Sequence, residues 1–323
     1  MRSVDRRTFL AFSMLAAGAP ALAFPVGGRP IKLIVGYPAG GGTDLQGRML
    51  GQHLSTALGV PALVDNKPGA GTMIAATELA KAAPDGHTLM YTPASTLAQL
   101  PQTMLAVKYD PMRDFTPIAQ CALGPVVLVL HKSVPAASLG ELIAHAKKHP
   151  GELNYVSQGV GTSAHIFGQM LRRQAGIDIV HVPYKGANDV AKDFIAGRVH
   201  LQFASSSAAT QLARSGQVRL LGIVAPRRSE LFPELATMSE LGIAGMDMDT
   251  SLGLIGPARI PPEVVARISD AVRGIMAIPQ VREEFRAGGV EPKWAGPAEF
   301  TETIRESHAA WARLLATVGY KKE

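Results

Sequence analysis

The chain has 323 residues and a formal net charge of +6, which is long enough for two domains. That charge is too small to indicate a nucleic-acid-binding protein, so we expect no nucleic acid among its partners. Hydrophobic residues make up 47% of the chain and charged residues 18%, the balance of an ordinary globular protein. Beyond the N-terminus no apolar run reaches the ~18–20 residues of a membrane-spanning helix, so we expect a soluble mature chain.

Residues 1–23 predict a signal peptide for export. Arg2, Arg6 and Arg7 form a basic start, an apolar stretch follows, and 21–23 resembles a cleavage site. The segment 5–10 resembles a twin-arginine (Tat) signal, and ordinary Sec export is the alternative. The signal carries three Arg and one Asp, a net +2, so its removal changes +6 to +4. We therefore expect the mature protein in the periplasm.

Cysteine and histidine usage argues against metal and redox chemistry. Cys121 is the only cysteine, which excludes an intramolecular disulfide and a cysteine-based metal site, and it lies beside an apolar run. We expect it to be a buried, inert thiol. The nine histidines show no paired metal spacing, so we expect no metal and no cofactor.

Predicted strands and helices alternate from residue 31. The first elements are a strand at 31–35, a helix from Thr43 that Gly59 ends, a strand at 62–64, a helix at 73–82 and a strand at 88–92. The first helix has one apolar stripe, formed by Leu45, Met49, Leu50, Leu54 and Leu58. This order predicts a mainly parallel sheet with helices on its faces.

A second series of elements begins near residue 126. Its strands are expected at 126–130, 154–157, 177–182, 199–204 and 219–224, with helices at 139–148 (capped by Ser138), 165–174, 189–196 and 206–215. A strand at 251–256 and helices at 263–276, 280–287 and 297–317 complete the chain. We predict two α/β domains, 24–127 with 250–323 and 128–249. The strands near 126–131 and 250–256 would cross between them.

Three of the predicted strands run into glycine-rich turns that open helices. These turns lie within 31–44, 63–72 and 153–163. Each leaves unpaired backbone N–H groups beside small hydroxyl side chains, which favours an anion through hydrogen bonds and the helix dipole. Because ligands of open α/β sheets bind at the carboxyl ends of strands, the turns should face one another across a cleft.

Motifs for catalysis or nucleotide binding are weak. The segment 159–164 fits a loose dinucleotide fingerprint, but no acidic residue ends the following strand. Ser163 and His165 are too close in sequence to imply a nucleophile and its base, and no Gly-x-Ser-x-Gly elbow occurs. We expect no catalytic residues and no enzyme; an esterase that uses Ser163 is the enzymatic alternative.

Six ordered segments resemble the Bug-type extracytoplasmic substrate-binding proteins of tripartite tricarboxylate transporters. They are Tyr37-Pro38-Ala39-Gly40-Gly41-Gly42-Thr43-Asp44, and the stretches 64–71, 84–89, 109–117, 154–165 and 181–186. The resemblance implies a two-lobed type II periplasmic-binding-protein fold, with two α/β domains joined by crossover strands and a ligand cleft between them. It also implies a small carboxylate as the ligand and membrane carrier subunits as partners. We expect a monomer.

The resemblance further implies a set of ligand-binding residues. A carboxylate would be held by backbone amides and small hydroxyls, often through ordered waters. The residues are Tyr37, Ala39, Gly41, Thr43 and Asp44 in the first turn, Ala70, Gly71 and Thr72 in the second, and Ser157, Gly161, Thr162 and His165 in the other lobe, with Tyr184 closing the pocket and Ser205 nearby.

Two departures from the family pattern bear on ligand contacts. Gly197-Arg198-Val199-His200 stands where the family usually has Gly-x-Val-Asp, and Thr250-Ser251-Leu252 lacks the aromatic residue often found before the second crossover strand. Ligand contacts near Ser205 and Thr250 should therefore differ from those of the usual member.

Several assignments have alternatives. We expect Asp44 to fix its loop as a helix N-cap or first-turn acid, since a second negative charge would repel a carboxylate. His165 as a satisfied structural histidine and Tyr184 as plain packing are the alternatives to ligand contact. A periplasmic ligand sensor for a signalling system, built on the same fold, is the alternative to transport.

Overall fold

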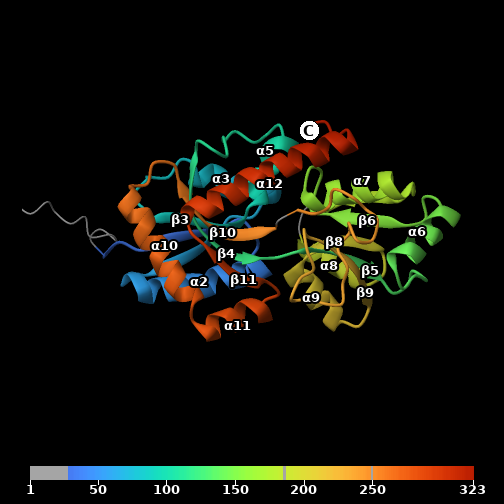
Figure 1. The fold of residues 1–323 in the computed structure, drawn as a ribbon, viewed down its shortest axis with the longest axis horizontal. Coiled ribbons are helices and arrows are strands. Elements are labelled where there is room, and N and C mark those ends of the chain that lie inside the picture. The colour runs from blue at the N-terminus through green and yellow to red at the C-terminus, as the bar shows by residue number, and fades with distance from the viewer. Residues whose placement is uncertain (1–27, 185–186, 249) are drawn as a thin grey trace, which may run out of the picture.

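The computed structural model describes residues 28–184, 187–248 and 250–323, and shows two sheets side by side, each flanked by helices (Figure 1). The predicted signal peptide lies outside the described residues, as do Lys185 and Gly186 of the sixth family-like segment. Within the part of the chain that the structure describes, no helix has both the length and the apolar character needed to cross a bilayer.

The first sheet has six strands in the order β11-β4-β10-β3-β1-β2. Their bounds are β1 Ile31–Val35, β2 Ala62–Asn66, β3 Thr88–Pro93, β4 Phe115–Leu123, β10 Ser251–Pro257 and β11 Glu291–Ala295. β1 is parallel to β2 and β3, but β10 is antiparallel to both β3 and β4, and β11 is antiparallel to β4. The predicted parallel pairing is therefore confirmed for β1, β2 and β3. The sheet as a whole is mixed, because β10, where the chain returns from the second lobe, and β11 run antiparallel to their neighbours.

Helices cover both faces of this sheet. They are α2 Gly42–Leu58, η2 Ala70–Thr72, α3 Met73–Leu79, α4 Ser95–Ala98, α5 Leu100–Thr103, α10 Pro262–Met276, α11 Pro279–Ala287 and α12 Pro297–Val318. On α2 the predicted stripe was wrong at Leu45, whose side chain is 52% exposed. Gly47 and Gly51 are buried instead, because their lack of a side chain lets the helix approach β1 closely. The left-handed Gly59 ends α2 as predicted.

The second sheet has five strands in the order β7-β6-β8-β5-β9. Their bounds are β5 Val126–His131, β6 Asn154–Ser157, β7 Val180–Pro183, β8 Leu201–Ser205 and β9 Val218–Val224, and the helices are α6 Leu139–Lys148, α7 Ser163–Ala175, α8 Ala187–Ile195 and α9 Ser206–Arg214. β6 is parallel to β7 and β8, whereas β5 is antiparallel to β8 and β9. Ser138 caps α6 as predicted, accepting a hydrogen bond from the Glu141 backbone N–H at 3.2 Å.

The first connection between the two sheets is very short, whereas the return from β9 to β10 spans residues 225–250. β4 and β5 are separated only by Gly124 and Pro125. The strands expected to cross between domains, 126–131 and 250–256, each belong to one sheet, so the crossing itself falls before β5 and before β10. β5 begins at Val126, two residues ahead of the predicted domain boundary.

The C-terminal helix α12 contributes to both lobes. Its first half, with Phe300 and Ile304, packs in a core with residues of β1, β3 and α3. Its second half carries Trp311, whose ring stacks on Phe167 of α7 with centroids 5.3 Å apart. α12 therefore runs along both lobes (Figure 1).

The predicted burial of Cys121 is confirmed. The thiol lies on β4 with no exposed surface, and desolvation raises its pKa to about 12. A thiol with so high a pKa is almost entirely protonated at neutral pH and is a poor nucleophile.

Candidate functional site

Four loops at the carboxyl ends of strands meet at the junction of the two lobes. A Cβ atom placed on Gly36, after β1, would lie 2.8 Å from the Cβ of Thr72 in the second turn. One placed on Gly71 would lie 3.7 Å from the Cγ2 of Thr162 in the third turn. One placed on Gly42 would lie 2.6 Å from the Cβ of Ser207, at the start of α9. The structure thus brings together the three predicted glycine turns, and adds the loop between β8 and α9.

The second turn has an unusual backbone. Gly69, Ala70, Gly71 and Thr72 have successive φ values of 136°, 45°, 62° and 89°. Positive φ at a residue with a side chain costs of order 1–3 kcal/mol, and such strain concentrates at functional sites. The Thr72 N–H closes the turn on the Gly69 carbonyl at 3.0 Å. The N–H groups of Ala70 and Gly71 have no hydrogen-bond partner among the described residues, so they can serve a ligand.

A relay of buried threonines holds this strained turn. The Thr72 hydroxyl lies 2.8 Å from the Thr96 hydroxyl, which lies 2.6 Å from that of Thr92. All three side chains are about 1% exposed. The ring hydroxyl of Tyr109 donates to the Thr96 carbonyl at 2.6 Å. The relay uses the hydroxyl of Thr72 within the first lobe, which leaves backbone amides as the free donors of this turn.

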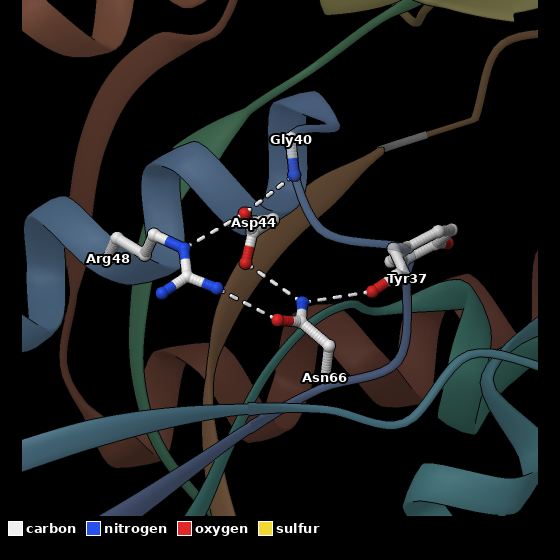
Figure 2. Close-up of polar contacts among 5 residues, drawn as sticks. All are labelled: Tyr37, Gly40, Asp44, Arg48 and Asn66. Atoms are coloured by element: carbon white, nitrogen blue, oxygen red, sulfur yellow. Dashed lines mark hydrogen bonds and ion pairs between the residues drawn. The ribbon is translucent and has the colours of Figure 1, made fainter. Parts of the chain in front are cut away.

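In the first turn the Asp44 carboxylate accepts hydrogen bonds from its own loop and helix and from β2 (Figure 2). One carboxylate oxygen accepts from the Gly40 N–H at 2.8 Å and from the Arg48 Nε at 3.0 Å, and the other accepts from the Asn66 amide at 2.8 Å. Asn66 also donates to the Tyr37 carbonyl at 3.0 Å, which ties β2 to the first turn. With its side chain 1% exposed, the carboxylate has its lone pairs committed to the protein, which supports the loop-fixing role.

The pKa of Asp44 is lower than its ordinary value. Burial alone would raise this pKa, but the hydrogen bonds from Arg48, Gly40 and Asn66 outweigh burial. Because the folded pKa lies below the unfolded one, the stabilisation from this carboxylate is present at neutral pH. It is lost as the pH falls through the folded pKa.

Replacing Asp44 by asparagine is therefore expected to lower the free energy of unfolding by about 1.5–3 kcal/mol at pH 7, because charge-assisted bonds to three donors are lost. The difference from the parent chain should shrink as the pH falls below the unfolded pKa of about 3.9, and should be lost once the pH is below the folded pKa, where the carboxyl is protonated in both states. Urea unfolding of both chains at pH 7 and near pH 3 measures this. A difference that stays constant with pH would contradict the assigned role.

The rest of the first turn offers backbone donors. Gly41 is the N-cap of α2, and the N–H groups of Gly42 and Thr43 have no partner among the described residues. Ala39 is exposed, and the Tyr37 ring is half-buried, where desolvation raises the pKa of its hydroxyl to about 12. The ring hydroxyl is therefore a neutral donor at any physiological pH.

In the third turn, the hydroxyls of Ser157 and Thr162 make hydrogen bonds within the second lobe. The Thr162 hydroxyl donates to the Gly159 carbonyl at 2.7 Å. The Ser157 hydroxyl lies 3.0 Å from the same carbonyl and 2.7 Å from the Nε2 of His181. Among the described residues the side chain of Thr162, the N-cap of α7, makes no capping bond, so it does not block the first-turn amides of this helix.

His165 is satisfied within the second lobe. Its Nδ1 accepts from the Gly161 N–H at 3.1 Å, so the neutral ring carries its proton on Nε2. The amide group of Gln169 lies 2.8 Å from Nε2, and this N–H donates to it when the amide is turned so that its oxygen faces the ring. The ring stacks on His181 at 4.2 Å between centroids. Burial lowers the pKa of His165 and lowers that of His181 to about 4, so both remain neutral. This geometry matches the structural alternative for His165.

Sequence reasoning missed Gln99, which joins the lobes. From the end of α4 its amide nitrogen donates to the Gly161 carbonyl at 2.6 Å, and its amide oxygen accepts from the Ser163 hydroxyl at 2.5 Å. The Ser163 proton thus faces Gln99 rather than His165, so these two residues do not form a nucleophile and base. A partner 62 residues away leaves no local sequence signal.

Tyr184 and Ser205 are held by their own lobe. The Tyr184 hydroxyl donates to the carboxylate of Asp193 at 2.7 Å, and its ring packs beside the core of the second lobe. The Ser205 hydroxyl caps α9 by accepting from the Ala208 N–H at 3.3 Å. The neighbouring Ser207 is the residue that reaches the first lobe, donating to the Gly288 carbonyl at 2.5 Å.

Two α/β lobes whose strand-end loops converge at their junction define a solute-binding protein of the periplasmic type. The chain matches the model of the tripartite tricarboxylate transporter family receptor, TctC, over residues 47–320, and it belongs to that family. It is 32% identical to the "UPF0065 protein in gbd 5'region" of Cupriavidus necator, over 99% of each chain. It is 31% identical to "Protein BugT" of Bordetella pertussis, over 97% of this chain and 96% of the relative. The family resemblance predicted from sequence is thus confirmed.

Solved structures support the same assignment. The periplasmic binding protein BugD is 28% identical, with a TM-score of 0.83 over 91% of this chain and 99% of its own. The R. palustris protein Rpa4515, solved with adipate, is 28% identical, with a TM-score of 0.86 over 93% of this chain and 100% of its own. MatC from Rhodopseudomonas palustris, solved with malate, is 28% identical, with a TM-score of 0.82 over 90% of this chain and 100% of its own. The predicted two-lobed fold class is confirmed.

Proposed function

We propose that this protein is a periplasmic receptor that captures a small carboxylate between its two lobes and delivers it to the membrane carrier of a tripartite tricarboxylate transporter. The observation that carries the proposal is the strained second turn. The amides of Ala70 and Gly71 have no partner among the described residues, and a Cβ placed on Gly71 would lie 3.7 Å from the Cγ2 of Thr162 in the other lobe. Backbone amides in such a concave turn bind anions without a basic side chain.

Recognition by amides fits the distribution of charge. The charge of Asp44, the acid of the first turn, is compensated by Arg48, and its second oxygen accepts from Asn66, which reduces its repulsion of an incoming carboxylate. The three turns themselves, 36–44, 66–72 and 157–163, contain a single Lys or Arg, which is Lys67. The Lys67 ammonium lies 3.4 Å from the Asp65 carboxylate and 3.5 Å from the Glu78 carboxylate. These two ion pairs already compensate its positive charge. Adipate and malate in the structures of relatives indicate the class of ligand to be tested.

We further propose that residues 24–127 with 250–323 and residues 128–249 move as two units. A ligand that contacts both lobes would shift the equilibrium toward the closed arrangement by its differential affinity for the two states. The contacts of Gln99 with the third turn belong to the closed arrangement in this proposal.

A thermal-shift screen tests the proposal. Mono-, di- and tricarboxylates, amino acids and aromatic acids are added singly to the purified chain. At a hundred times its Kd a ligand should stabilise the protein by ~2.7 kcal/mol, which is a rise of several degrees in Tm. We expect at least one carboxylate to do so and its amide or methyl ester to fail. A panel in which no acid shifts Tm, or in which the esters act equally, would overturn the proposal.

A further inference from the structure

Two histidines and a glutamate gather at the end of α6, away from the lobe junction (Figure 1). His145 lies in the last turn of α6, His149 is the C-cap of that helix, and Glu152 follows in the next turn. The His149 Nδ1 is 3.1 Å from one oxygen of the Glu152 carboxylate, and the His145 Nε2 is 4.0 Å from the other. The two imidazole rings stack with centroids 4.6 Å apart.

This cluster corrects the expectation that the histidines lack metal spacing. His145 and His149 are four residues apart at the end of a helix, which places both rings on the same face. Their nitrogens and the Glu152 oxygen all lie within 4.8 Å of one another. Ligands at ~2.1 Å from a tetrahedral ion would be about 3.4 Å apart, so small side-chain rotations would bring all three atoms onto one ion.

The burial of the three side chains suits such an adjustment. The side chain of His145 is 16% exposed and anchors the cluster, whereas those of His149 and Glu152 are 48% and 59% exposed and are free to rotate. The cluster lies at the C-terminal end of α6, where the helix dipole favours positive charge. Lys147 and Lys148 in the same turn oppose that effect, which argues for moderate affinity.

We propose that His145, His149 and Glu152 form a binding site for one divalent first-row transition-metal ion, with Zn²⁺ as the best match. Two imidazoles and one carboxylate are ligands that Zn²⁺ accepts, with water in the remaining position. Mg²⁺ and Ca²⁺ prefer all-oxygen sites and are poor matches. The proposal does not depend on the carboxylate receptor function, since the cluster lies at the far end of the second lobe.

Isothermal titration of the untagged, EDTA-treated full chain with Zn²⁺ tests the site. We expect one equivalent of Zn²⁺ to bind, with excess Mg²⁺ failing to compete. His149→Ala and Glu152→Gln should each weaken Zn²⁺ binding at least tenfold. Loss of a residue that only hydrogen-bonds to a metal ligand already lowers metal affinity about 10–100-fold, and loss of the ligand itself should lower it at least as much. Both side chains are largely exposed, so these variants should fold; circular dichroism verifies it.

His53→Ala is the matched control, because His53 lies half-buried on α2 in the other lobe. Its Zn²⁺ affinity should equal that of the parent chain. Absence of one-to-one binding in the parent, or binding by His149→Ala with unchanged affinity, would overturn the proposal and leave the cluster as a hydrogen-bonded helix end.

Discussion

Replacing Gly42 by alanine is expected to weaken carboxylate binding about 5- to 150-fold, while changing the stability of the ligand-free chain little. The new Cβ would lie 2.6 Å from the Cβ and 2.9 Å from the Oγ of Ser207, across the lobe junction. Ser207 cannot easily yield, because its hydroxyl is held by the Gly288 carbonyl at 2.5 Å and by the Gln46 amide at 3.2 Å. Overpacking of this kind costs about 1–3 kcal/mol, and here the cost falls on the closed arrangement.

Gly274→Ala is the matched control for this substitution. Gly274 also lies on a helix with ordinary φ, and a Cβ there would meet no atom of the described residues within 4 Å. Titration of the best ligand from the screen into the parent chain and both variants measures the effect. Equal affinity for Gly42→Ala and the parent would show that ligand binding does not require the lobes to approach as they do here.

Gly168→Ala should destabilise the fold strongly, by about 3 kcal/mol, at the upper end of the usual cost of overpacking. A Cβ on this residue of α7 would lie 2.0 Å from the Cε2 of Tyr155 and 2.4 Å from its Cδ2. The Tyr155 ring is 1% exposed and stacks on His181 with centroids 4.9 Å apart, so it has no space into which to move. The helix must therefore shift away from the sheet.

Gly274→Ala also serves as the control for Gly168→Ala, and its effect on stability should be opposite. Gly274→Ala should raise the free energy of unfolding by up to ~1 kcal/mol, because alanine loses less backbone entropy in an exposed helix position. Urea unfolding of the two variants measures both effects. Tyr155→Leu added to Gly168→Ala should restore part of the loss, since the two residues are in contact. A mild effect of Gly168→Ala alone would contradict the packing described for α7.

Elements with a clear periodicity could be predicted from sequence to within a few residues. β1, β6 and α6 have the predicted bounds, because apolar runs and caps mark them locally. β4 and β11 could not be predicted. Pro117 and Gln120 interrupt the first, and β11 reads Glu-Pro-Lys-Trp-Ala with no alternating apolar pattern. Pairing with β10 and β4 makes these segments strands, and such long-range pairing leaves no local signal.

The convergence of the three turns was predictable from sequence, because turn chemistry is local. Glycines and small hydroxyls marked the three turns, and the negative charge of Asp44 indicated its role in the loop. Gln99 and Thr96 could not be found in this way, because their partners lie far away in sequence. The histidine pair on α6 was different: its four-residue spacing is visible in the sequence, and the only missing information was the Glu152 that follows the helix.

Hydrogen–deuterium exchange with the best carboxylate from the screen tests the central claim most directly. If backbone amides of both lobes hold the ligand, peptides covering 67–73 and 159–166 should become protected together at saturation, while a peptide covering α6 stays unchanged. Protection confined to one lobe, or to neither turn, would contradict a ligand held by amides at the lobe junction.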